Sequence, residues 1–313
     1  MLTWKRVAFW SLATIALLAV AASGESLLGQ SSGDASRPAV IAANDPWPEI
    51  NLNVVVLDKQ GAPQTVDVTG FQLFEDGADR PLHFRGSADS PVSVALIVDS
   101  SGSIYKRKPE IISAVTTIIK ALPADSEVMG VLFADQAFID LPFTAVSKIN
   151  YSFLDRLDGR GGTALFDTVV ATENYFAVHA KYARRALVLI SDGGDNKSSL
   201  RGIDAIRRMQ WPCAPMFYTL LVHNSGAEYG ATERGKRTME LLAKAGGGVA
   251  FTPKEKDFLD DATQIAGMIR SQYVLHFASA DPARDGKAHK LEVRLPIKDL
   301  QIHALPVYYA PAN

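Results

Sequence analysis

The chain has 313 residues, of which 47% are hydrophobic and 21% are charged, so it should fold as one or two globular domains rather than as a disordered tail. Its 32 basic and 34 acidic residues leave a formal net charge of −2, which gives no overall field that would favour nucleic acid or an anionic membrane. A single cysteine, Cys213, excludes an internal disulfide framework and any zinc site built on several thiolates.

The first 22 residues have the form of an export signal. Lys5 and Arg6 precede an uncharged, mostly apolar run over residues 7–22, and Ala19 and Ala21 fit the small-x-small rule for cleavage. Because the run is at the short end for a bilayer span of about 20 residues, we predict a cleaved signal peptide over residues 1–22, with an uncleaved anchor as the alternative. The mature protein would then be periplasmic or secreted, with no membrane span. Residues 23–46, rich in Ser, Gly and Ala, are predicted to be a flexible linker.

Both ends of the remaining chain have β-strand patterns. Apolar residues alternate over residues 50–56, and residues 71–84 predict a hairpin that turns at Asp76-Gly77. Strand-like segments return at residues 273–277, 290–295 and 302–309. Isolated hairpins are marginally stable in water. We therefore expect residues 47–88 and 272–313 to form one small β-sandwich, with residues 89–271 inserted between them as a second domain.

The inserted region alternates between buried strands and helices. Short apolar runs typical of strands buried on both faces stand at residues 92–98, 128–134, 186–190 and 216–222, with a weaker one at 248–251. The helix-length segments between and after them are residues 104–122, 165–180, 200–209, 233–245 and 257–270. This alternation predicts an α/β fold with a doubly wound, mostly parallel sheet. Ligands of such sheets bind at the carboxyl ends of the strands.

Oxygen-bearing side chains are found where these predicted strands stop. Asp99-Ser100-Ser101-Gly102-Ser103 follows the first strand, Ser191-Asp192-Gly193-Gly194 follows another, and a glycine-rich loop over residues 159–162 ends in Thr163. Serines before a helix commonly cap it, which is the simpler interpretation of the first segment alone. Two carboxylates and three hydroxyls together suit Mg²⁺ or Mn²⁺. A metal ion held by so little charge would accept an incoming Asp or Glu carboxylate.

These three segments resemble the metal-ion-dependent adhesion site of von Willebrand factor type A domains. The resemblance covers residues 93–270 and implies a Rossmann-like domain that holds a divalent cation, Mg²⁺ first, with Mn²⁺ and Ca²⁺ as alternatives. The flanking β segments look like those of bacterial exported proteins related to this family. The resemblance implies a non-enzymatic, adhesion-type protein that captures an acidic group of a protein partner. Carried over by position, the implied metal ligands are Asp99, Ser101, Ser103, Thr163 and Asp192.

Other interpretations stay open at this point. Lys106, Arg107 and Lys108 are either a solvated helix face or a rim that attracts an acidic ligand. The alternative function is a metal-dependent hydrolase in which the same ion activates water, with Asp195 as the nearest spare carboxylate for a general base. In a third interpretation the metal only stabilises the domain, and the β-sandwich binds the partner.

Overall fold

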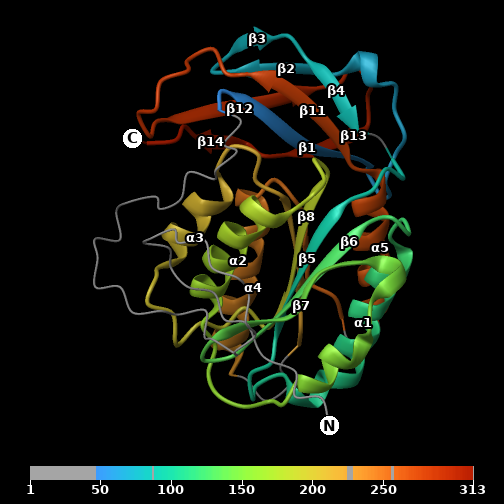
Figure 1. Cartoon of the computed structure of the whole chain (residues 1–313), viewed down its shortest axis with the longest axis vertical. Coiled ribbons are helices and arrows are strands. Elements are labelled where there is room, and N and C mark those ends of the chain that lie inside the picture. Colours follow the sequence, from blue (N-terminus) through green and yellow to red (C-terminus); the bar gives the residue numbers. More distant parts are fainter. Residues whose placement is uncertain (1–46, 87, 224–227, 255–256, 313) are drawn as a thin grey trace, which may run out of the picture.

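The computed structural model describes residues 47–86, 88–223, 228–254 and 257–312. A six-stranded sheet covered by helices forms one part of the molecule, and two four-stranded antiparallel sheets form the other (Figure 1). The predicted fold class, an α/β sheet inserted in a β-sandwich, is confirmed. The predicted signal peptide and linker lie outside the described residues. Within the described ranges, no helix combines the length and the apolar character needed to cross a membrane.

The central sheet has the strand order β10-β9-β8-β5-β6-β7. Its parallel strands are β5 (Ser93–Asp99), β6 (Glu127–Phe133), β8 (Arg185–Ser191), β9 (Met216–Leu221) and β10 (Ala250–Phe251). The edge strand β7 (Ala137–Ala145) pairs antiparallel with β6, and the sequence patterns did not predict it. Pro142 interrupts its pattern, and a proline within a strand is tolerated mainly at a sheet edge.

Helices cover both faces of this sheet (Figure 1). α1 (Lys108–Ala121) and α5 (Phe258–Ser271) pack on one face, where they share a core with Leu96 of β5. α2 (Leu165–His179), α3 (Gly202–Met209) and α4 (Tyr229–Ala245) cover the other face, together with Ile97. Every residue of β5 is buried, as expected for a strand between two helical layers. Short 3₁₀ helices lie at Val68–Gly70 (η1), Tyr105–Arg107 (η2), Val146–Lys148 (η3) and Tyr151–Arg156 (η4).

The strand order reverses between β5 and β8. From β5 the chain passes through α1 to β6 on one side, and it later returns through α2 to β8 on the other side of β5. Loops that diverge in this way leave a crevice at the carboxyl ends of the two strands, which is where doubly wound sheets bind ligands. This edge of the sheet lies at the end of the molecule away from the β-sandwich (Figure 1).

Segments from both chain ends build the β-sandwich. One sheet has the order β13-β1-β11-β4 and the other β14-β12-β2-β3. Apolar side chains of both sheets, among them Ile50, Leu73 and Phe277, form their common core. Residues 302–309, predicted as one strand, are two strands in different sheets, because the chain turns at Leu305-Pro306. The strands are β1 (Glu49–Asp58), β2 (Gln72–Glu75), β3 (Ala78–Arg80), β4 (His83–Gly86), β11 (Tyr273–Ala278), β12 (Ala288–Arg294), β13 (Leu300–Ala304) and β14 (Val307–Tyr309).

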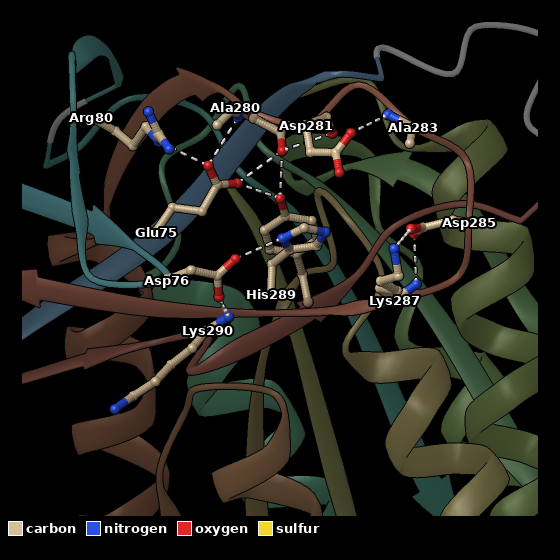
Figure 2. A network of polar contacts seen from close by, with 12 residues as sticks. Glu75, Asp76, Arg80, Ala280, Asp281, Ala283, Asp285, Lys287, His289 and Lys290 are labelled. Atoms are coloured by element: carbon tan, nitrogen blue, oxygen red, sulfur yellow. Dashed lines mark hydrogen bonds and ion pairs between the residues drawn. The ribbon is translucent and has the colours of Figure 1, made fainter.

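A polar network around Glu75 links strands of the sandwich (Figure 2). Glu75, at the end of β2, is 1% exposed and accepts hydrogen bonds from the Ala280 backbone N–H (2.9 Å), the Ser279 hydroxyl (2.9 Å), the Arg80 Nε–H (2.8 Å) and the Tyr308 hydroxyl. Ser279 and Ala280 belong to the connection after β11, Arg80 to β3 and Tyr308 to β14, so the buried carboxylate ties the two chain ends together. A fully hydrogen-bonded buried carboxylate of this kind stabilises the fold only as long as its donors stay in place.

One buried arginine marks the place where the chain passes between the two parts. Arg184 is 2% exposed, and its guanidinium donates to the carbonyl oxygens of Ser90, Ile269 (2.5 Å) and Arg270 (2.6 Å). Ser90 precedes β5, and the other two residues end α5, so a single side chain holds the entry and the exit of the inserted region. Burial lowers the pKa of Arg184 to about 10, which leaves it charged at neutral pH.

Candidate metal centre

The loop after β5 turns Asp99 and two of its three serines toward one another. Asp99 is 1% exposed, and its Oδ1 accepts a hydrogen bond from the Ser101 backbone N–H over 2.8 Å. The hydroxyl oxygens of Ser101 and Ser103 lie 3.0 Å apart. Ser100 has a different role, because its hydroxyl accepts from the Asp158 N–H over 3.1 Å. Ser101 and Ser103 therefore lie on the side of Asp99, whereas Ser100 anchors the neighbouring loop at Asp158.

The loop after β8 reaches the same place from the adjacent strand. The Ser191 hydroxyl donates to Asp99 Oδ2 over 2.6 Å and accepts from the Gly193 N–H over 3.0 Å. Asp192 Oδ1 accepts from the Gly194 N–H over 3.0 Å, which turns this carboxylate back over its own loop. The negative charge of Asp192 is close enough to disfavour ionisation of Asp99. The two carboxylates predicted from the sequence are thus brought together.

Helix α4 packs directly under the Asp192 loop through a glycine. A Cβ atom at Gly235 would lie 2.0 Å from the backbone oxygen of Asp192, so no larger residue fits there without a shift of the helix or the loop. The contact is reciprocal, since a Cβ atom at Gly193 would lie 2.3 Å from the oxygen of Gly235. This close approach of two backbones fixes the height of the Asp192 loop above the sheet edge.

The third predicted segment is linked to the loop that follows Asp192. Thr163 is 5% exposed, its N–H donates to Asn196 Oδ1 over 2.9 Å, and its carbonyl oxygen accepts from the Asn196 N–H, also over 2.9 Å. The preceding Gly162 N–H donates to Asp135 Oδ1 over 2.9 Å. Thr163 is therefore held between the β8 loop and the turn that joins β6 to β7. Sequence reasoning missed the anchoring role of Asn196 and Asp135.

Asp195 holds the start of helix α2. Its Oδ1 accepts from the Leu165 N–H over 2.9 Å and from the Ser198 hydroxyl over 2.5 Å. The Ser198 hydroxyl in turn accepts from the Phe166 N–H over 3.0 Å. A side chain that satisfies the first N–H groups of a helix acts as a cap, even when it comes from a distant loop. The carboxylate that the sequence left as a spare general base is thus engaged in holding the helix that follows Thr163.

The electrostatics of the site depend on the buried carboxyl group of Asp99. Burial raises the pKa of Asp99 to about 6, and the charge of Asp192 adds to the rise, against the hydrogen bonds from Ser191 and Ser101. Among the described residues, no Lys or Arg side chain forms an ion pair with Asp99. Buried charges in proteins are normally paired or coordinate metals. A cation bound between the two carboxylates would relieve this cost.

The chemistry of the donor set selects the class of metal. In the part of the chain that the structure describes, no group of three or more His, Cys, Asp or Glu side chains is placed to hold an ion. A metal at this edge would therefore rely on hydroxyl oxygens beside two carboxylates. Such all-oxygen sets suit hard cations such as Mg²⁺, whereas zinc prefers nitrogen and sulfur ligands. These oxygen donors fit the divalent cation that the resemblance implied.

The three basic residues after the first loop have different surroundings. Lys106 is exposed, whereas Arg107 lies against Glu110, with its Nε 3.4 Å from Glu110 Oε1. Lys108 donates from Nζ to the carbonyl oxygen of Asp155 over 3.1 Å. Their role as a rim that attracts an acidic ligand stays a prediction.

The fold and this arrangement define a class: a doubly wound α/β domain with hard oxygen donors at the point where the strand order reverses. Residues 94–194 match the family model of the von Willebrand factor type A domain, so this chain contains a type A domain. A search of curated proteins gives no match.

Several solved structures are similar to the chain at low sequence identity. A von Willebrand factor type A protein from Catenulispora acidiphila is 12% identical, with a TM-score of 0.47, over 84% of this chain and 74% of its own. The von Willebrand factor domain of the type V pilus tip protein Mfa5 from Porphyromonas gingivalis is 12% identical, with a TM-score of 0.44, over 59% and 96%. The manganese-loaded TRAP protein of Plasmodium vivax is 15% identical, with a TM-score of 0.42, over 72% and 97%.

Proposed function

We propose that this chain is an exported, adhesion-type binding protein that captures an acidic group of a protein partner through a divalent cation at the edge of its type A domain. The ligands of the cation are Asp99, Ser101, Ser103, Thr163 and Asp192. Mg²⁺ is the first choice, with Mn²⁺ and Ca²⁺ as alternatives. The observation that carries the proposal is the buried Asp99 carboxylate, which lies beside Asp192 and two hydroxyls without a pairing cation among the described residues.

Each residue has a separate task in this function. Asp99 and Asp192 supply the charge that attracts the cation, and the serine and threonine hydroxyls add donors without adding charge. A bound cation would supply an electrophilic position for a carboxylate. Ser191 orients Asp99 through the 2.6 Å hydrogen bond, and Asn196 holds the backbone of Thr163. The edge of the sheet is open toward the outside, because Ser103 is exposed and Asp192 is half-buried.

The structure favours binding over the hydrolase alternative in one specific respect. A hydrolase needs a general base within hydrogen-bond reach of the attacked water. Asp195, the carboxylate that the sequence offered as a general base, accepts hydrogen bonds from the Leu165 N–H and the Ser198 hydroxyl and holds α2. We therefore assign the chemistry of the site to ligand capture, with no catalytic residue.

Calorimetric titration of the full chain with Mg²⁺, Mn²⁺ and Ca²⁺ tests the metal site. Wild-type protein should bind one ion and gain about 2.7 kcal/mol of stability at an ion concentration 100 times Kd. Asp99→Asn should abolish uptake and leave the fold intact. Ser100→Ala is the matched control in the same loop, because its hydroxyl bonds to Asp158 rather than to the donor set. Equal uptake by Asp99→Asn and wild type would overturn the site.

Capture of an acidic group is tested separately, with immobilised synthetic peptides. A peptide with one Glu in a Gly/Ser background should bind wild-type protein with Mg²⁺ present, release it on addition of EDTA, and lose binding when Glu is replaced by Gln. Uptake of the ion without any dependence of peptide binding on Mg²⁺ would favour the third interpretation, in which the metal only stabilises the domain. Turnover of a generic phosphoester that requires Mg²⁺ would favour the hydrolase.

A further inference from the structure

A cavity of about 390 Å³ opens beside the candidate metal centre. It shares Ser100 with the loop after β5 and Gly161 with the loop that leads to Thr163. Its floor contains Leu132 and Phe133 at the end of β6. The volume is within the range of about 300–1,000 Å³ that is usual for ligand pockets. A partner segment whose acidic side chain reaches the metal would therefore place a neighbouring side chain at this cavity.

Most charged groups that line the cavity are engaged by the protein itself. Arg156 and Asp140 form an ion pair with each other. Asp135 accepts from the Gly162 N–H over 2.9 Å and lies 3.7 Å from Lys197 Nζ. Asp158, also in the lining, accepts weakly from the Ser100 hydroxyl over 3.4 Å.

Arg160 is the exception in this lining. Its side chain is exposed, and among the described residues it forms no ion pair, side-chain hydrogen bond or ring contact. An Arg guanidinium presents paired N–H donors that match a carboxylate in a bidentate geometry. Because the carboxylates of the described lining already have donors, this guanidinium is the charged group of that lining that is left to recognise a partner.

The loop holds the backbone of Arg160 in place. Gly159 and Gly161 flank it with φ values of +68° and +80°, a backbone conformation that L side chains rarely adopt. A Cβ atom at Gly159 would lie 2.2 Å from the Tyr105 ring, and one at Gly161 would lie 2.3 Å from Asp135 Oδ2. The loop is thus packed on both sides of the arginine, which fixes the backbone from which the Arg160 side chain extends into the cavity lining.

We propose that Arg160 binds a second carboxylate of the same partner, so that the protein recognises a segment with two acidic side chains, one at the metal and one in the cavity. This inference rests on the proposed function, because the first carboxylate is the one captured by the cation. It names the partner more narrowly, as an acidic segment rather than a single Asp or Glu.

The test compares full-length wild type and Arg160→Gln on immobilised synthetic peptides in saturating Mg²⁺. One peptide carries a single Glu in a Gly/Ser background, and the others carry a second Glu one to four positions away on either side. A charge-assisted hydrogen bond pair predicts that wild type binds the best two-Glu peptide about tenfold more tightly than the one-Glu peptide. In Arg160→Gln this ratio should fall to about one, and Arg160→Lys should restore it only in part.

Lys244→Gln, which removes an exposed positive charge in the last turn of α4, is the matched control and should keep the wild-type ratio. Uptake of Mg²⁺ by Arg160→Gln should equal that of wild type, which separates loss of recognition from loss of the metal centre. The inference is overturned if wild type shows no preference for a second Glu, or if Arg160→Gln keeps the preference. Failure of every Glu peptide to bind in Mg²⁺ overturns the proposed function itself.

Discussion

The hydroxyl of Ser191 donates a 2.6 Å hydrogen bond to Asp99 Oδ2 and thereby joins the carboxyl ends of two adjacent parallel strands. Ser191 is the last residue of β8 and is fully buried, and Asp99 is the last residue of β5. The same hydroxyl accepts from the Gly193 N–H over 3.0 Å, so it also shapes the loop that carries Asp192. One buried serine therefore positions both carboxylates of the candidate centre without being a metal ligand.

Ser191→Ala should weaken Mg²⁺ binding by about 10- to 100-fold, as is usual when a group that orients a metal ligand is removed. The variant should also lose about 1–3 kcal/mol of unfolding free energy, because it leaves a buried carboxylate oxygen and a buried N–H without a partner. Ser198→Ala is the control, since that hydroxyl caps α2 and touches no proposed ligand. Calorimetry and urea unfolding measure the two quantities, and an unchanged Mg²⁺ affinity in Ser191→Ala would contradict the positioning role.

Gly235→Ala should disturb the metal centre although Gly235 is not one of the proposed metal ligands. The added methyl group would lie 2.0 Å from the Asp192 backbone oxygen, so α4 or the Asp192 loop must move. We expect a loss of about 1–3 kcal/mol of stability, as for other overpacked sites, together with weaker Mg²⁺ binding. Gly267→Ala in α5 is the matched control, because its methyl group would meet only Pro63 Cγ at 3.8 Å and should stabilise the helix by up to about 1 kcal/mol. Thermal unfolding with and without Mg²⁺ distinguishes the two variants. Equal stability and equal stabilisation by Mg²⁺ in both would contradict the close contact between Gly235 and the Asp192 backbone.

The sequence was sufficient for the elements that rest on local patterns. The apolar run of β5 and the Asp76-Gly77 turn between β2 and β3 follow from composition and turn chemistry, and the structure has both. Strand β7 was missed because a proline and half-exposed positions hide an edge strand. The role of Asp195 at the start of α2 was missed for another reason. Its backbone partner, the Leu165 N–H, is about 30 residues away in the sequence, and no local pattern encodes a cap supplied by a distant loop.

The buried Glu75 gives the sandwich a dependence on acid (Figure 2). Burial alone would raise the pKa of Glu75, but donors led by the Tyr308 hydroxyl and the Ala280 N–H hold it below the usual value of 4.5. A carboxyl with a lowered folded-state pKa stabilises above its unfolded pKa and loses that contribution as the pH falls through the folded value. Glu75→Gln should therefore cost about 1–3 kcal/mol at pH 7 and progressively less below pH 4.5. Urea unfolding of wild type and Glu75→Gln from pH 3 to 7 measures this loss of unfolding free energy. A loss that does not change with pH would contradict an ionised Glu75 in the folded protein.

Glu173, in α2, should have the opposite dependence on pH. It is 1% exposed, and burial raises its pKa from 4.5 to about 7, although Arg208 and Arg185 oppose the rise. Because the folded state holds this proton more tightly than the unfolded chain, the contribution of Glu173 to stability is greatest below pH 4.5 and is lost as the pH rises from 4.5 through 7, by about 3 kcal/mol in total. Glu173→Gln removes the titration, so its stability relative to wild type should increase between pH 5 and 8. Glu240→Gln, an exposed position on α4, should differ from wild type by a constant amount over that range. If the Glu173→Gln difference is equally flat, Glu173 is ionised in the folded protein and its burial is compensated by the two arginines.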